Sequence, residues 1–254
     1  VTLMLIMGIL NVTPDSFADG GRHNEFDAAV ARGLEMIAEG VDIIDIGGES
    51  TRPGAERVSE AEEIERTIPV ITELAKHGAR ISIDTMRAST AEAAIKAGAS
   101  IINDVSGGLA DPLMLQTAAR LKVPYIAMHW RGQSKVMNSK AIYNNVVNDV
   151  ISELQERITA AQDAGIKPNN LIIDPGLGFA KDAEHNWAII DSVESFVEMG
   201  YPVLIGASRK RFLGGDTPDE REQATIDLTK RLATTGVWAV RVHSVKPHKE
   251  VLAQ

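Results

Sequence analysis

Short apolar runs alternate with longer amphipathic segments along the whole chain. The apolar runs are rich in branched side chains, as buried parallel strands are, and they lie at 5–10, 41–46, 79–83, 99–103, 125–128, 171–174, 203–205 and 239–242. The segments between them repeat apolar residues at helical spacing, and they lie at 27–39, 60–76, 88–97, 112–121, 146–164, 184–199 and 218–234. A short segment at 246–254 is expected to form one more helix.

Glycine follows most of the predicted helices, just before the next strand, as expected for helix C-caps. The six positions are Gly40, Gly78, Gly98, Gly165, Gly200 and Gly236. About eight strand–helix units in a chain of 254 residues match an α/β fold, the closed (β/α)₈ TIM barrel. An open doubly wound sheet usually has fewer units and a glycine fingerprint after its first strand, which is missing here. Without an interior linker, residues 1–254 are expected to form a single barrel domain.

Composition narrows the classes of function. The net charge of -9 argues against nucleic acid or an acidic membrane surface as a partner. The absence of cysteine excludes disulfides, thiolate metal sites and cysteine nucleophiles. Residues 1–7 are apolar but carry no basic stretch, which favours a first strand over a signal peptide. No apolar run is long enough to cross a bilayer, so a cytoplasmic location is expected.

Polar residues stand at or just after the end of every predicted strand. They are Asn11, Asp45, Asp84, Asn103, Asp104, His129, Asp174, the run 208–210, and Arg241 with His243. In a (β/α)₈ barrel the loops after the strands converge on one mouth, so we expect these side chains to meet there. The stretch 171–181 is the clearest case, because a buried strand ends in Asp174 and a Gly/Pro loop follows. A carboxylate in that place is costly unless something specific pairs with it.

Four of these residues form a mixed donor and acceptor set: Asp84, Asn103, Asp174 and Lys210. A buried carboxylate accepts two parallel N–H bonds well, and an amide beside it can donate and accept. This chemistry predicts a flat, nitrogen-rich heterocycle as the ligand. Apolar walls for such a ring are expected from Ile101, Met128 and Phe179.

A second set suits phosphate oxygens, which guanidinium groups bind bidentately. Its members are Asn11, Thr51, Arg52, Arg241 and His243. Asn11 is equally suited to Mg²⁺, which takes few protein ligands when phosphate supplies the others. The loops 12–22 and 47–55 carry Gly/Pro punctuation and charged tips, and we expect them to order over a ligand.

Several strings together resemble the dihydropteroate synthase family. The longest are GILNVTPDSF at 8–17, DIGGESTRPGA at 45–55 and DPGLGFAK at 174–181. Shorter matches are SIDT at 82–85, INDV at 102–105, MH at 128–129, SRK at 208–210 and RVH at 241–243, all in family order over almost the whole chain. The resemblance implies a (β/α)₈ barrel enzyme, a transferase of folate biosynthesis. Such an enzyme condenses (7,8-dihydropterin-6-yl)methyl diphosphate with 4-aminobenzoate, releases pyrophosphate and requires Mg²⁺.

The family's residue roles are carried over position by position. The pterin ring would be held by Asp84, Asn103, Asp174 and Lys210 and lined by Met128 and Phe179. The diphosphate would contact Asn11, Thr51, Arg52, Arg241 and His243, with Asn11 at the metal. The 4-aminobenzoate pocket would be shaped by Phe17, Pro53 and Ser208. The catalytic residues would be Asp15, Asp84 and Lys210. The resemblance further implies a homodimer and inhibition by sulfonamides.

Two features depart from the family pattern. Ser244 follows the Arg-Val-His motif where the family usually has aspartate, and the segment 226–231 is unusually polar for a helix that often contributes to a dimer. Two alternatives stay open: a pterin-binding methyltransferase domain and a catalytically idle, pterin-binding paralogue. The phosphate set and the 8–17 loop argue against the first. The presence of Asp15, Phe17, Arg52 and Lys210 argues against the second.

Isolated aromatic and imidazole side chains are more typical of packing than of function. This applies to Trp187, Trp238 and His185, whereas His129 is equally consistent with supporting the site and with a simple cap.

Overall fold

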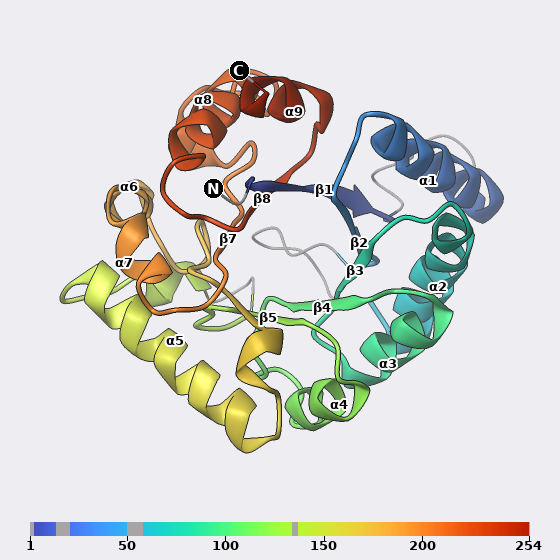
Figure 1. The fold of residues 1–254 in the computed structure, drawn as a ribbon, viewed down its shortest axis with the longest axis horizontal. Coiled ribbons are helices and arrows are strands. Elements are labelled where there is room, and N and C mark those ends of the chain that lie inside the picture. Colours follow the sequence, from blue (N-terminus) through green and yellow to red (C-terminus); the bar gives the residue numbers. More distant parts are fainter. Residues whose placement is uncertain (1–2, 14–20, 50–57, 134–136, 254) are drawn as a thin grey trace.

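The computed structural model describes residues 3–13, 21–49, 58–133 and 137–253. Within these ranges, eight parallel strands form one sheet in the order β6-β5-β4-β3-β2-β1-β8-β7. Their bounds are β1 Leu5–Asn11, β2 Ile43–Gly47, β3 Ile81–Asp84, β4 Ile101–Asp104, β5 Tyr125–Met128, β6 Leu171–Asp174, β7 Leu204–Ile205 and β8 Ala239–Val242. A parallel bridge between Ile173 and Val203 joins the two ends of the sheet, so the strands close into a barrel (Figure 1). The predicted α/β barrel is confirmed.

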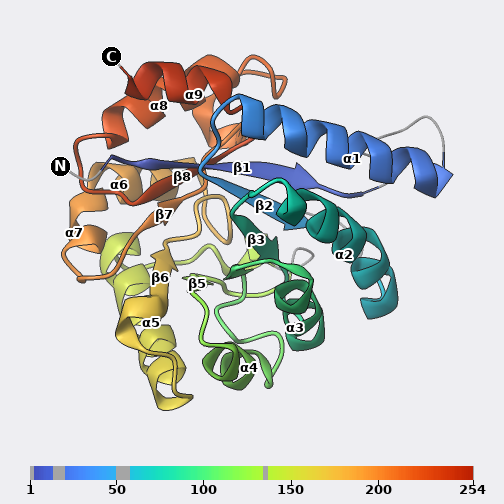
Figure 2. The same cartoon turned by 45° about the vertical axis from the view of Figure 1, so that its right-hand side comes forward.

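Helices surround the strands on the outside (Figures 1 and 2). Their bounds are α1 Gly21–Ala38, α2 Glu60–Lys76, α3 Ala88–Ala97, α4 Met114–Leu121, α5 Val146–Asp163, α6 Ala183–Asp191, α7 Val193–Val197, α8 Glu222–Leu232 and α9 Lys246–Leu252. Short 3₁₀ turns lie at Met137–Lys140, Pro168–Asn170 and Arg211–Leu213. No helix in the described ranges combines the length and the apolar character needed to cross a membrane.

The six predicted glycine caps all adopt positive φ, as the helix-end rule requires. The expected helix at 184–199 was wrong as a single element, because Ser192 leaves helical geometry at φ -116° and ψ 25° and separates α6 from α7. The expected helix at 218–234 is also shorter than predicted. Before α8, the Arg221 side chain donates to the carbonyl oxygens of Gly214, Gly215 and Asp216 and holds that segment as a turn.

The two-residue period of the strands sorts their side chains into two environments. One set packs outward against the helices and forms the main core, for example Ile44, Ile81 and Ile173. The other set fills the barrel with an apolar layer of Met7, Ile43, Ile101, Ile126, Ile172, Leu204 and Ala239. Ile101 therefore lies in this layer and not in a wall of the mouth, which corrects the expectation from the sequence. Two residues further along several strands, the inward positions become polar.

Candidate active site

The polar layer comes from strands that are far apart in sequence. Inward positions near the strand ends carry Asp45 on β2, Asp84 on β3, Asn103 on β4, Asp174 on β6 and Arg241 on β8. The register pairs Asp84 with Asn103 and Met128 with Asp174. All three acidic residues and Asn103 are buried, so each must find a partner inside the protein.

Arg241 connects the polar groups on one side of the mouth. Its Nε donates to Asp45 Oδ2 at 2.6 Å, and its Nη2 donates to Asp84 Oδ2 at 2.8 Å. Asn103 Nδ2 donates to the same Asp45 oxygen at 3.0 Å, whereas Asp45 Oδ1 has no hydrogen-bond partner among the described residues. Burial raises the pKa of Asp84 to about 7, although the Arg241 charge acts in the opposite direction. A guanidinium already shared by two carboxylates fixes the orientation of both.

Asp174 and Lys210 lie on the other side. Asp174 Oδ1 accepts a hydrogen bond from the Gly176 amide at 2.7 Å. Lys210 Nζ donates to the Leu177 carbonyl oxygen and lies 4.9 Å from the centroid of the Phe179 ring. Burial raises the pKa of Asp174 and lowers the pKa of Lys210 to about 8. Removal from water thus brings the ionisation of both groups closer to neutral pH.

Gly206, just after β7, shows how close the two sides are. A Cβ atom built on Gly206 would lie 3.9 Å from Asp174 Oδ2 and 4.0 Å from both Lys210 Nζ and Arg241 Cβ. Arg241 in turn contacts Asp84 directly and Asn103 through Asp45. Asp84, Asn103, Asp174 and Lys210, which the sequence predicted to act together, therefore surround one space.

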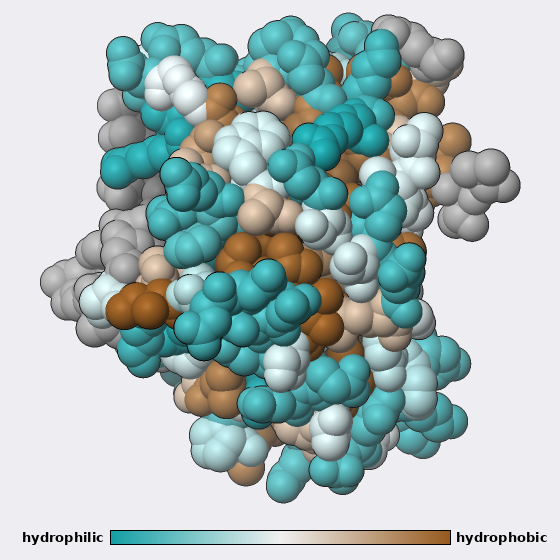
Figure 3. Space-filling model, turned by 90° about the vertical axis from the view of Figure 1, so that its left-hand side faces the viewer, coloured by the Kyte–Doolittle hydropathy of each residue, from teal (hydrophilic) through white to brown (hydrophobic). Residues whose placement is uncertain are grey.

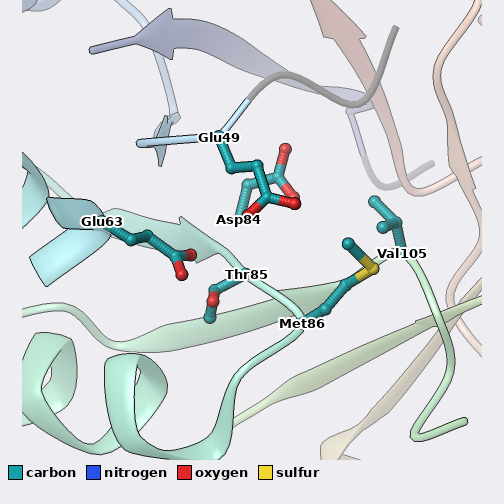
Figure 4. A pocket seen from close by; sticks show the side chains of 6 residues that line it. All are labelled: Glu49, Glu63, Asp84, Thr85, Met86 and Val105. Carbon is teal, nitrogen blue, oxygen red and sulfur yellow. The ribbon is translucent and has the colours of Figure 1, made fainter. Parts of the chain in front are cut away.

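Apolar side chains line the mouth beside these charges. Met86, Val105 and Met128 form a buried cluster, and Phe179 packs against it. A small pocket next to this cluster is lined by Glu49, Glu63, Asp84, Thr85, Met86 and Val105. Figure 4 shows Glu49 and Asp84 on one side of it and Met86 and Val105 on the other. A carboxylate facing an apolar wall suits a flat ring whose edge carries N–H groups.

Ser208, predicted for the 4-aminobenzoate pocket, contacts His243, predicted for phosphate. Ser208 Oγ lies 2.9 Å from His243 Nδ1, and it accepts a hydrogen bond from the His243 amide at 3.2 Å. Asn11 is half-buried at the end of β1, beside Gly47 of β2. The predicted residues Asp15, Phe17, Thr51, Arg52 and Pro53 lie outside the described residues.

Two polar strand ends face the helices, not the mouth. Asp104 accepts hydrogen bonds from the amides of Ser106 and Gly108 and from the hydroxyls of Ser106 and Tyr125. It is therefore a fully satisfied buried cap. His129 is buried between Glu153 of α5 and Lys181, so both residues are removed from the set expected to line the mouth.

Two residues of this region received no role from the sequence. Asp45 was named only as a polar residue at a strand end. Its position two residues after Ile43 places it on the inward face of β2. Lys181 closes the DPGLGFAK string, but nothing in the sequence shows that its amine turns back into the protein. Across the described ranges, no three His, Cys, Asp or Glu side chains are grouped so that they could hold a metal ion.

Comparison with known proteins places this geometry in a family. A family model described as pterin binding enzyme matches residues 7–243. The dihydropteroate synthase of Mycobacterium leprae is 47% identical over 97% of this chain and 90% of its own length. That of Bacillus subtilis is 48% identical over 95% of this chain and 84% of its own length. The chain belongs to the dihydropteroate synthase family.

Solved structures of this family share the fold. A dihydropteroate synthase of Xanthomonas albilineans with 4-aminobenzoic acid is 42% identical, covers 99% of this chain and 92% of its own, and has a TM-score of 0.93. The same enzyme has been solved with 7,8-dihydropteroate, and the Yersinia pestis enzyme with a sulfonamide drug. As a member of the dihydropteroate synthase family, the protein is an enzyme, a transferase.

Proposed function

We propose that the enzyme joins (7,8-dihydropterin-6-yl)methyl diphosphate to 4-aminobenzoate, forming 7,8-dihydropteroate and pyrophosphate. The observation that carries the proposal is the convergence of Asp84, Asn103, Asp174 and Lys210 on one space bounded by an apolar wall. Family members that bind 4-aminobenzoic acid and 7,8-dihydropteroate support the choice of substrate and product.

The proposed roles follow from the chemistry of each group. The Asp174 carboxylate accepts N–H bonds from the pterin edge, Asn103 and Lys210 complete that edge, and Met128 and Phe179 lie against the ring. Arg241, His243 and Asn11 hold the diphosphate, together with Thr51 and Arg52. Ser208 contributes to the 4-aminobenzoate pocket with Phe17 and Pro53. Asp15, with Asp84 and Lys210, completes the catalytic set.

We propose that the diphosphate leaves before the amine attacks. The C–O bond breaks with its electron pair going to the diphosphate, whose charge Arg241 stabilises. The positive charge left on the methylene carbon is shared with the pterin ring, and the nearby Asp84 carboxylate favours it. The 4-aminobenzoate nitrogen then forms the C–N bond and loses a proton, so no protein nucleophile is required.

Mg²⁺ is the proposed cofactor, and the residues present are compatible with it. Asn11 offers a neutral amide oxygen at the mouth end of β1, and Mg²⁺ commonly takes few protein ligands when phosphate oxygens supply the rest. When bound, Mg²⁺ would neutralise charge on the departing diphosphate. Chelation by EDTA should abolish pyrophosphate release and added Mg²⁺ should restore it, and unchanged release in EDTA would exclude this cofactor.

Pyrophosphate release in the presence of both substrates and Mg²⁺ tests the proposed reaction. Release that depends on 4-aminobenzoate, with formation of 7,8-dihydropteroate, is the expected result. Pterin binding without release would identify an idle binding protein, and transfer of a methyl group from a methylfolate would identify a methyltransferase. A sulfonamide that mimics 4-aminobenzoate should compete with it, as the Yersinia pestis complex suggests.

We also infer a homodimer. The support is the family resemblance and the face over α5 to α8, where apolar side chains gather between hydrophilic ones (Figure 3). Trp187 of α6 is 37% exposed and stacks edge-on against Phe212 at a centroid distance of 5.7 Å. Light scattering of the purified protein should give twice the chain mass, and a monomer at micromolar concentration would contradict the inference.

A further inference from the structure

We propose that Lys181 is a positioning residue for the pterin ring and that it acts by fixing the loop 175–182, with His129 as its partner. This inference rests on the proposed function, because it assigns a role in holding the same ring. Lys181 is 8% exposed, and no substrate role was assigned to it from the sequence. A charged lysine amine is costly to bury unless acceptors inside the protein match its N–H groups. Buried ionisable groups of this kind are typical of functional sites.

The amine of Lys181 is fully used inside the protein. Lys181 Nζ donates to His129 Nδ1 at 2.8 Å, to the Gly176 carbonyl oxygen at 3.0 Å and to the Phe179 carbonyl oxygen at 3.0 Å. An ammonium group has three N–H donors, and here three acceptors match them. Two of these acceptors belong to the loop itself, so the side chain ties the loop to the end of β5.

His129 is held so that it can accept this bond. Burial lowers the pKa of His129 to about 4, so the ring is neutral at pH 7 and only one nitrogen carries a proton. That proton lies on Nε2, which donates to Glu153 Oε2 at 2.8 Å. Arg131 Nε donates to the same Glu153 oxygen at 3.1 Å. The chain of contacts therefore runs from α5 through His129 to Lys181 and the loop.

The loop 175–182 has a strained backbone and carries groups that contact Lys210. Gly176 and Gly178 have φ values of 70° and 77°, and Ala180 has a φ of 49°, which is strained for a residue with a side chain. The same loop carries the Leu177 carbonyl that accepts from Lys210 and the Phe179 ring beside the Lys210 amine. Any shift of the loop would therefore move both Lys210 and the apolar wall of the proposed pterin site.

The charge of Lys181 makes the anchor sensitive to pH. Burial lowers the pKa of Lys181 to about 7. The positive charges of Lys210 and Arg131 lower this pKa further, whereas the negative charges of Asp174 and Glu153 raise it. Above that pH a neutral amine keeps only two N–H donors for three acceptors. Because one contact is then lost, the KM for the pterin substrate should increase as the pH passes through 7.

Steady-state kinetics of Lys181→Met test this role, with Lys167→Met as the matched control because Lys167 is exposed and precedes the turn before β6. We expect the KM for the pterin substrate to rise about tenfold, the effect of losing a hydrogen bond to a charged group. The KM for 4-aminobenzoate should change less than about twofold. The variant should also lack the part of the pH dependence of the pterin KM that Lys181 supplies.

Two variants of His129 separate positioning from general stability. Asparagine can place an oxygen near the position of Nδ1 and keep the acceptor for Lys181, whereas glutamine reaches the position of Nε2 and keeps only the contact with Glu153. We expect His129→Gln to raise the pterin KM as Lys181→Met does, and His129→Asn to stay closer to the wild type. Equal effects of both changes on KM, or a loss confined to kcat, would overturn the proposal.

Hydrogen exchange keeps the inference separate from the proposed reaction. Amides of residues 177–180 should exchange faster in Lys181→Met than in the wild type, while the strands of the barrel should be unchanged. If the wild type released no pyrophosphate, the proposed function would fail, and the exchange data would still decide whether Lys181 holds the loop. Unchanged exchange in a folded Lys181→Met protein would refute the anchor.

Discussion

At the scale of single residues, Gly206 sets how much room the mouth leaves between its charged groups. A Cβ atom there would be in ordinary contact with Asp174, Lys210 and Arg241, so alanine should fit, whereas the two methyl groups of valine must extend into the shared space. We predict that Gly206→Val folds but binds a pterin about tenfold or more weakly, the usual cost of overfilling a packed site. Calorimetric titration with 6-hydroxymethylpterin measures this, with Gly206→Ala as control. Wild-type affinity in the valine variant would exclude a ring at this place.

Asp174 is the residue with the sharpest chemical requirement. Asp174→Asn keeps the shape of the side chain but replaces one acceptor by a donor at the edge of the ring. We predict about a hundredfold lower pterin affinity, because charge-assisted hydrogen bonds are lost and a donor then faces a donor. The exposed Asp163 at the end of α5 supplies the matched control Asp163→Asn. Near-normal turnover in Asp174→Asn would contradict the assignment of the ring site.

At the scale of elements, Ser244 shows how the last two helices accommodate the departure from the family pattern. Ser244 Oγ donates to Glu222 Oε1 of α8, and Arg209 Nε donates to Glu222 Oε2 at 2.6 Å. His248 of α9 lies 3.5 Å from the same carboxylate and contacts Thr229 through Nδ1 at 2.8 Å. Glu222 thus places a carboxylate next to Ser244, where the family usually has aspartate, and links α8 to α9 and to the Arg209 loop.

Glu222→Gln tests this link through stability. We predict a loss of about 1–2 kcal/mol in the free energy of unfolding at pH 7, because hydrogen bonds to a charged group are weakened. The pKa of Glu222 is lowered in the folded state by its bonds to Ser244 and Arg209 despite burial. Its stabilisation is therefore complete above pH 4.5 and fades as the pH falls below that value. Urea unfolding at pH 7 and pH 4 measures the difference, with the exposed Glu198→Gln as control. An effect of equal size at both pH values would contradict the electrostatic account.

Most elements could be predicted from hydrophobic period and glycine caps, because both report local geometry. The break between α6 and α7 could not, since Ile189, Ile190, Val193 and Phe196 keep an apolar face on both sides of Ser192. The direction of a strand-end side chain was also missed at Asp104 and His129. Polarity at a strand end does not show whether a side chain points into the barrel or toward the helices. The two-residue period of the strand, counted from Ile101 and Ile126, does show this.

At the scale of the whole molecule, the mouth concentrates buried charges whose ionisation costs stability. Lys210 has a pKa of about 8 in the folded protein and 10.5 as the unperturbed value. Between these values the unfolded chain binds more protons, so the contribution of Lys210 to the free energy of unfolding increases with pH. We predict that the wild type gains up to about 3 kcal/mol relative to Lys210→Met between pH 7.5 and pH 10.5. Thermal unfolding of both proteins across this range measures it, and a constant difference would argue against a buried lysine.

The sequence predicted the architecture and the four residues proposed to surround the ring, since a closed barrel brings strand ends together whatever their distance in the chain. It could not predict that Arg241, assigned to diphosphate, would pair with Asp45 and Asp84. Nor could it predict the inward turn of Lys181. Such contacts depend on side-chain rotamers and on which buried charges lie within reach of each other, and no period or motif encodes these. The single-domain organisation stays a prediction.

The apolar layer that fills the barrel below the polar residues has a consequence for how a ligand enters and leaves the site. Met7, Ile126, Ile172 and Leu204 are all essentially inaccessible to water, so a bicyclic ligand bound above them would have a closed apolar floor beneath it. It must depart by the route it entered. If 4-aminobenzoate binds nearer the rim than the pterin, it would slow the dissociation of the pterin beneath it. A compound that links the two groups covalently should therefore dissociate more slowly than either group alone.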